Sequence, residues 1–144
     1  MWIIYALGAS LMWGLTYVIN EQVYRKISVI TSLAITTLAT GFVMLLIAYG
    51  GHFLKRDFVA IAGSRRPLYL IIAETVILIL AEIFIGFSIT SKSATLAGLI
   101  EISYPIFIAI FAFLLFKENQ LSASTAVGGA LIFIGVFIIY YFNK

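Results

Sequence analysis

The sequence contains no cysteine, and its only histidine is His52. The absence of cysteine excludes disulfide bonds, thiolate metal sites and a cysteine nucleophile. His52 stands alone in a glycine-containing connection, where a histidine is more often solvated than bound to a metal. Charged residues are scarce as well, at 10% of the chain against about 25% in a soluble domain. This composition excludes an ordinary water-soluble globule.

What the sequence has in abundance is apolar runs. Hydrophobic residues make up 63% of the 144 residues, and the mean hydropathy is +1.14. A helix of about 20 apolar residues crosses the hydrocarbon core of a bilayer. We expect five such helices, at residues 2–19, 29–49, 68–89, 94–116 and 123–142. The predicted fold class is therefore all-α integral membrane, with residues 1–144 forming a single domain, a five-helix transmembrane bundle.

The predicted connections are short and carry typical helix-starting residues. Ser93 and Ser122 are expected to be the N-caps of the fourth and fifth helices, and Pro67 the first residue of the third. The connection that opens at Gly50 is the longest and is predicted to be a loop. Helices joined this closely must be antiparallel, so an odd number of them places the two termini on opposite sides of the membrane.

The basic residues show almost no bias between the two sides of the membrane. The four on one side are Arg25, Lys26, Lys92 and Lys144, and the five on the other are Lys55, Arg56, Arg65, Arg66 and Lys117. The dense connection between the second and third helices favours a cytoplasmic N-terminus, although both orientations are physically possible. Because most basic residues form pairs at helix ends, they fit lipid headgroups better than a nucleic acid.

One acidic residue lies inside the fourth predicted helix. Glu101 belongs to an otherwise uncharged run, and Pro105, four positions later, has no N–H to donate to its carbonyl. Tyr104 is expected on the same helix face, and Gly98 one turn earlier leaves room beside the carboxylate. An acid at membrane depth is energetically expensive and usually marks an ion or substrate path, so Glu101 and Tyr104 are predicted binding residues. The alternative is a protonated glutamate that only hydrogen-bonds a neighbouring helix.

The third predicted helix carries two further acids, Glu74 and Glu82. Eight residues separate them, which is about 80° around a helix and about 12 Å along it, so they do not share one site. Glu82 lies nearer the midplane and is a candidate for binding an ion or substrate. Glu74 lies closer to the connection, and a structural role, such as pairing with Arg65 or Arg66, is favoured for it.

Polar and aromatic residues form stripes on the first two helices. The first stripe is Ser10, Trp13, Tyr17, Asn20 and Tyr24, and the second is Ser32, Thr36 and Thr40. Aromatic surfaces with a few polar groups suit an organic cation or an amphipathic substrate, so Trp13, Tyr17 and Asn20 are candidate substrate-binding residues. For the first stripe, the alternative is ordinary helix packing with an interfacial position for Tyr24. The second stripe could line a pore, and the alternative is hydroxyls bonded to their own backbone or to a neighbour.

Small residues gather on one face of the last predicted helix, namely Ser124, Gly128 and Gly135. Small side chains let helix backbones approach closely, which drives helix association in lipid. The face is predicted to pack against another helix or to form a dimer, and its partner can be internal or a second chain.

Several of these segments also resemble a known family. The sequences ATLAGLIEISYPIF at 94–107, LFKE at 115–118 and GGALIFIGV at 128–136 resemble the closing part of an EamA-type domain of the drug/metabolite transporter superfamily. LMWGLTYV at 11–18 resembles the first helix of such a domain. Typical members carry two of these five-helix domains, so the resemblance implies one half of a ten-helix inverted-repeat transporter. The seven-residue glycine spacing is similar to the dimerisation motif of the related small multidrug resistance proteins.

These observations predict a membrane transporter and disfavour an enzyme. The predicted helices hold no histidine, lysine or aspartate, so a Ser–His pair, paired aspartates and a histidine-bound metal are missing. We expect transport of small organic metabolites or drug-like cations by alternating access as a dimer, coupled to H⁺ or Na⁺, with no cofactor. The expected location is a bacterial or archaeal inner membrane. The alternatives are a non-transporting assembly or regulatory subunit, or one half of a hetero-paired carrier.

Overall fold

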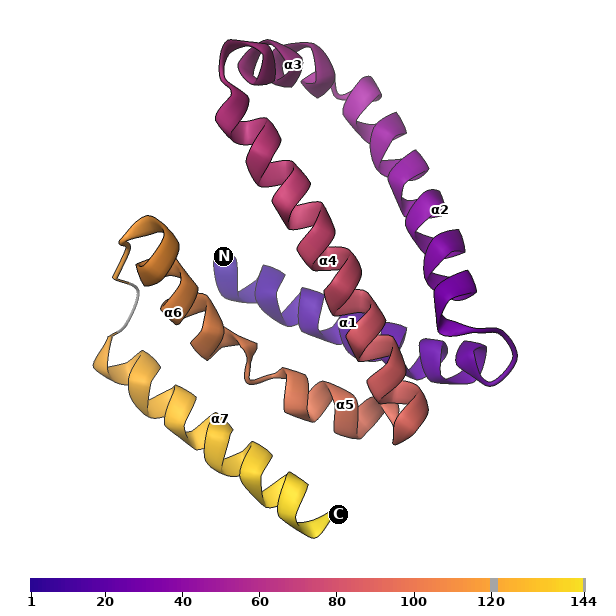
Figure 1. The fold of residues 1–144 in the computed structure, drawn as a ribbon, viewed down its shortest axis with the longest axis vertical. Helices are drawn as coiled ribbons and strands as arrows, with labels where there is room; N and C mark the ends of the chain where they lie inside the picture. The colour runs from indigo at the N-terminus through magenta and orange to yellow at the C-terminus, as the bar shows by residue number, and fades with distance from the viewer. Residues whose placement is uncertain (120–121, 144) are drawn as a thin grey trace. The chain divides into compact units, whose positions relative to one another are not determined.

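The computed structural model describes residues 1–119 and 122–143, and in these ranges helices are the regular secondary structure (Figure 1). The helices are α1 (Trp2–Tyr24), α2 (Val29–Gly50), α3 (Phe53–Gly63), α4 (Arg65–Ser91), α5 (Ala94–Glu101), α6 (Tyr104–Phe116) and α7 (Ala123–Phe142). Within the described residues, α1, α2, α4, α7 and the combined segment Ala94–Phe116 are long and apolar enough to cross a membrane. The prediction of an all-helical protein with five such segments is confirmed.

The chain forms two compact units, and the boundaries between them fall inside α1 and α4. One unit comprises Met1–Glu21 and Ser88–Lys144, and the other comprises Gln22–Phe87. The first unit therefore contains most of α1 together with α5, α6 and α7. The second contains α2, α3 and most of α4. Residues 120 and 121 of the predicted turn before α7, and Lys144, lie outside the described residues.

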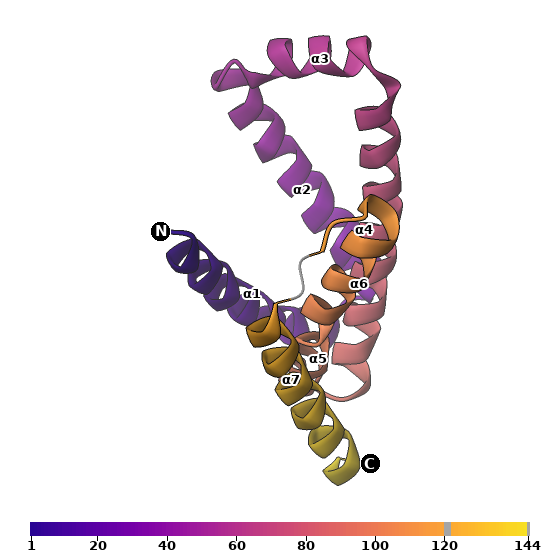
Figure 2. The ribbon, with the colours of Figure 1, turned by 90° about the vertical axis from the view of Figure 1, so that its left-hand side faces the viewer.

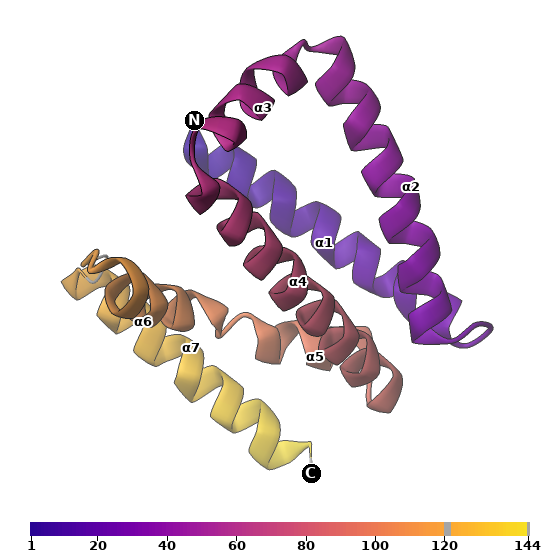
Figure 3. The ribbon, with the colours of Figure 1, turned by 45° about the horizontal axis from the view of Figure 1, so that its top comes forward.

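Four alanines and one isoleucine are the buried residues of the unit that contains α5, α6 and α7. Its buried residues are Ile89, Ala94, Ala97, Ala109 and Ala112. In Figures 1 and 3, α7 runs back beside α5 and α6, and α5 and α7 are in contact. In lipid, where apolar side chains gain little by leaving the solvent, such small residues favour helix association because they let backbones approach.

The fourth predicted span is interrupted near its middle. Helix α5 ends at Glu101 and α6 begins at Tyr104, with Ile102 and Ser103 between them. The physical cause is Pro105, which cannot donate a backbone hydrogen bond to the Glu101 carbonyl and whose ring disfavours a continuous helix. The predicted segment over 94–116 is one of the five that could cross a membrane, and it consists of two helices.

The serine caps were predicted correctly, but the long connection was not. The Oγ atoms of Ser93 and Ser122 accept hydrogen bonds from the N–H groups of Leu96 and Thr125, at 3.2 and 3.1 Å. The predicted loop after Gly50 contains the eleven-residue helix α3. Helix α4 starts at Arg65, so Pro67 lies within its first turn instead of opening it, which a proline tolerates because its missing N–H would have no helical partner there.

In the second unit, α2 and α4 diverge from a close contact, and α3 runs across between their other ends (Figure 2). Gly86 of α4 is buried at the close contact. A Cβ atom at this position would collide with Cγ1 of Val29 and would lie 3.5 Å from the Tyr24 hydroxyl. Val29 is β-branched and buried, so its side chain has little freedom to move away.

We expect Gly86→Ala to destabilise the protein by about 1–3 kcal/mol, because the added methyl group overpacks the contact with Val29. Gly41→Ala on α2 is the matched control, since a Cβ there has no neighbour within 4 Å. The control should be neutral or stabilising by up to about 1 kcal/mol, because alanine is the better helix former. Unfolding of both variants in mixed micelles measures the difference. Equal stability of the two variants would contradict the close contact at Gly86.

The five spanning segments also predict the sidedness of the chain ends. Reporter domains fused at residues 1 and 144 should lie in opposite compartments, because an odd number of crossings separates them. A reporter activity that differs between the two sides of the membrane, used in paired fusions, provides the measurement. Two ends reporting the same compartment in the same molecules would show that one segment does not cross.

Candidate functional site

The interrupted span is linked to α1 through a carboxylate. Glu101 ends α5, and its side chain accepts a hydrogen bond from the hydroxyl of Tyr17, 84 positions earlier in the chain. Both residues are half-buried. A polar group among apolar helices is costly without a hydrogen-bond partner, so this bond supports the retention of an acid there.

Two neighbours position the Tyr17 ring. A Cβ atom at Gly98 would lie 3.3 Å from Cδ2 of Tyr17, so the ring packs directly on the backbone of α5. Trp13 meets the same ring edge-on, with centroids 5.8 Å apart and planes inclined by 65°. The structure thus brings together Trp13, Tyr17, Gly98 and Glu101, which the sequence had marked on two separate helices.

Glu21 is a contact residue that the sequence analysis missed. Its Oε2 accepts a hydrogen bond from the N–H of Ala94 at 2.8 Å, at the first turn of α5. Tyr17 contacts Glu101, the last residue of α5, and Glu21, one helical turn later in α1, contacts Ala94, the first residue of α5. The two helices are therefore antiparallel. The spacing of four residues from Tyr17 was the available signal, but Glu21 lay beyond the predicted end of the first span.

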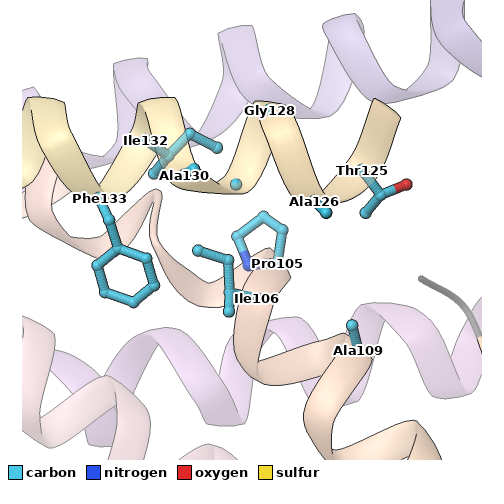
Figure 4. Close-up of a pocket in the computed structure, with 10 residues that line it drawn as sticks. Pro105, Ile106, Ala109, Thr125, Ala126, Gly128, Ala130, Ile132 and Phe133 are labelled. Atoms are coloured by element: carbon cyan, nitrogen blue, oxygen red, sulfur yellow. The ribbon is translucent and has the colours of Figure 1, made fainter. Parts of the chain in front are cut away.

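An apolar cavity of about 330 Å³ lies between α6 and α7 (Figure 4). Its lining includes Pro105 and Ile106 from α6 and Gly128 from α7, and Thr125 has the one polar side chain among the described residues that line it. The volume falls within the range of small-molecule sites. Because these lining residues carry no charge, the cavity differs in character from the surroundings of Glu101.

The relationship of the chain to known proteins agrees with its membrane architecture. A model of the EamA-like transporter family matches residues 1–141 of the 144-residue chain. The chain belongs to this family. Searches of curated proteins and of solved structures give no significant match. EamA-like proteins are membrane transporters of the drug/metabolite transporter superfamily and not enzymes, so this EamA-like chain is an integral, multi-pass membrane protein with a small-molecule substrate.

The other predicted site residues of this EamA-like chain lie on α1, α4 and α6. Tyr104 begins α6 after the interruption and is 55% exposed, so the argument from regular helical spacing does not place it beside Glu101. Asn20 lies half-buried on α1, next to Glu21. Glu82 lies half-buried on α4 in the second unit, whereas Glu74 on the same helix is exposed.

At Thr36, the hydroxyl stripe of α2 agrees with the interpretation that its hydroxyls bond their own backbone. Thr36 Oγ1 donates to the carbonyl of Ser32 at 3.0 Å, one turn earlier in the same helix. Ser32 itself is buried. A threonine that bonds its own backbone needs no ligand to satisfy it, so Thr36 is explained without a pore.

The small residues of α7 have different surroundings from one another. The Ser124 hydroxyl lies 2.8 Å from that of Ser122 and so belongs to the N-cap cluster of the helix. Gly129 approaches Ile106 of α6, whose Cγ1 would lie 3.1 Å from an added Cβ. Among the described residues, a Cβ at Gly128 or Gly135 would have no neighbour within 4 Å. Gly129 therefore makes the close contact of α7 with α6 in this EamA-like chain, whereas Gly128 borders the cavity and Gly135 has open space beside it.

Acidic and histidine residues do not gather into a metal site in the part of the chain that the structure describes, where no group of three or more could hold an ion. The candidate site is accordingly the Tyr17–Glu101 pair with its packing neighbours Trp13 and Gly98, and with Glu21 at the other end of α5.

Proposed function

We propose that this EamA-like chain carries small organic metabolites or drug-like cations across the membrane by alternating access, as a dimer and coupled to H⁺ or Na⁺. The observation that supports this most is the hydrogen bond between Tyr17 and Glu101 at the interruption of a spanning segment. A helix interrupted at membrane depth frees backbone groups for ligands, and transporters commonly build their sites at such points.

Glu101 is the proposed coupling residue. Its carboxylate can bind Tyr17 or exchange this partner for a proton, a sodium ion or a cationic substrate. When a cation binds, the tyrosine hydroxyl no longer faces a bare negative charge, so the link between α1 and α5 weakens. The two occupancies thereby favour different arrangements of the helices, which is the requirement for ligand-driven switching.

The aromatic rings beside the carboxylate indicate the class of substrate. The faces of Trp13 and Tyr17 can attract an organic cation, and such contacts contribute about 0.5–2 kcal/mol each. Trp13 remains half-exposed, so part of its ring is free to meet a ligand. We therefore propose Glu101, Trp13 and Tyr17 as the primary binding residues, with Asn20, Tyr104 and Glu82 contributing after rearrangement.

A second five-helix unit is part of this proposal. Transporters of inverted-repeat design place the substrate between two units, and this chain provides one. The near-equal basic residues on its two sides allow an inverted second copy, so an antiparallel homodimer is favoured. A hetero-pair with a different five-helix chain is the alternative assembly. The proposed location is a bacterial or archaeal inner membrane.

Transport by the purified chain in proteoliposomes tests the proposal. A pH-sensitive dye trapped inside reports proton movement, while ethidium, tetraphenylphosphonium and a set of labelled amino acids serve as substrates. We expect at least one of them to accumulate when a proton or sodium gradient is imposed, and protein-free liposomes provide the baseline. A folded chain that moves no compound under either gradient would support the competing role of a non-transporting subunit.

A further inference from the structure

Helix α3 is too short to cross the membrane and connects two helices that do. It spans Phe53–Gly63, about 16 Å at 1.5 Å per residue, which is half the thickness of the hydrocarbon core. It follows the end of α2 at Gly50 and precedes the start of α4 at Arg65. Figures 2 and 3 show α3 running across between those two helix ends. Because α2 and α4 extend from the two ends of α3 and are each long enough to cross a membrane, α3 is expected to lie at the membrane surface.

The helix has one apolar face. Leu54, Phe58 and Ile61 are separated by four and three residues, so they lie on the same side. Leu54 and Ile61 are the two residues of α3 that are half-buried, and Phe58 between them is 67% exposed. A large exposed aromatic ring on this face is suited to the boundary between headgroups and acyl chains.

Positive charge surrounds this face. Lys55 and Arg56 of α3, and Arg65 and Arg66 in the first turn of α4, are all exposed. Asp57 is the one acid between Phe53 and Arg66, which leaves a net charge of +3 from four bases and one acid. Asp57 pairs with Arg56 at 3.1 Å, but the two side chains are 55% and 78% exposed, so this ion pair is weak.

We propose that α3 and the first turn of α4 form a binding site for anionic phospholipid headgroups. The apolar face enters the acyl boundary, while the four basic side chains reach lipid phosphates, a combination typical of surface-lying helices. The site holds this end of α2 and α4 at a leaflet that contains anionic lipid. The proposal stands independently of what the chain transports.

Lipid retention by the intact protein tests this site. The chain is reconstituted in nanodiscs with equal amounts of phosphatidylglycerol and phosphatidylcholine, released, and examined by native mass spectrometry. We expect more bound phosphatidylglycerol than phosphatidylcholine. In the variant K55Q/R56Q/R65Q/R66Q, this excess of phosphatidylglycerol should fall roughly tenfold or more. The matched control is R25Q/K26Q, a basic pair in the connection between α1 and α2. This variant should change the retention of phosphatidylglycerol less than about twofold. Equal retention of the two lipids, or an equal loss in the control, would overturn the proposal.

Two further measurements address the source and the depth of binding. Inorganic phosphate at millimolar concentration should not displace the lipid, and displacement would mean that the site binds free phosphate instead. Because the chain has no cysteine, F58C and A60C each provide a single spin-label position on opposite sides of α3. The label at 58 should collide with oxygen from the bilayer, and the label at 60 with a water-soluble relaxant. A water-exposed label at 58 in membranes containing phosphatidylglycerol would contradict the proposed placement.

Discussion

Glu101→Gln is expected to insert and fold normally but to lose substrate-driven ion flux, to about 1% of the original rate or less. Glutamine keeps the volume of the side chain and can still accept the hydrogen bond from Tyr17, but it neither carries a charge nor binds a proton at working pH. The assay is gradient-driven uptake in proteoliposomes, with protein amounts matched by quantitative gel analysis. Exchange of substrate without a gradient should persist better than coupled uptake.

Two variants make this result specific. Glu74→Gln removes an exposed acid from α4 and should leave uptake within about twofold of the original. Tyr17→Phe keeps the ring against Gly98 and Trp13 but removes the hydroxyl that binds Glu101. A hydrogen bond to a charged group contributes about 1.5–3 kcal/mol, so the ion affinity of Glu101 should shift by roughly tenfold or more. Full coupled uptake by Glu101→Gln would exclude the carboxylate as the coupling group.

Hydropathy was sufficient to predict the five spanning segments, because each is a mostly apolar run of about 20 residues, the length at which a helix crosses lipid with its backbone groups hydrogen-bonded internally. Hydropathy did not predict the helical residues that lie outside the apolar runs. Helix α1 continues to Tyr24 through Asn20, Glu21 and Gln22, which are polar but compatible with helix. Helix α3 mixes charged and apolar residues over eleven positions and follows two glycines, so hydropathy alone made it resemble a loop.

The candidate site was predictable by residue but not by contact. Glu101 stands out because it is an acid in an apolar run, and Tyr17 because it belongs to an aromatic stripe. Their hydrogen bond joins positions 84 residues apart, and no local pattern specifies which face of α1 meets α5. Glu21 was missed for a related reason, since its role as a partner of the Ala94 N–H depends on the antiparallel alignment of the two helices.

The glycines of α7 show how the structure refines a sequence motif. A seven-residue spacing picks out Gly128 and Gly135, but the close contact inside the chain is made by Gly129, which lies against Ile106. In the part of the chain that the structure describes, a Cβ atom at Gly128 or Gly135 would meet no atom within 4 Å. The space beside Gly128 belongs in part to the cavity between α6 and α7, which Gly128 lines. Because close helix packing in lipid requires small residues, this face of α7 is proposed as the seam for a second chain.

Replacing both glycines, as Gly128→Leu with Gly135→Leu, is therefore expected to dissociate the proposed dimer and to abolish transport while the single chain stays folded. Two leucines add bulk along one face of α7 and hold a partner helix away by several ångströms. Leucine is also a better helix former than glycine, so α7 itself should not weaken. Oligomeric state in nanodiscs, measured by single-molecule photobleaching, and uptake in proteoliposomes provide the two readouts.

The controls separate loss of the partner from general damage. Gly8→Leu with Gly41→Leu adds the same bulk at two positions on α1 and α2 that also have no neighbour within 4 Å, and it should leave both readouts unchanged. Gly129→Leu forces a collision with Ile106 and should lower the stability of the chain itself. If the Gly128 and Gly135 double variant unfolds like Gly129→Leu, the face is internal. If it is a folded monomer in nanodiscs that transports at the full rate, one five-helix chain is sufficient and the dimer is not required.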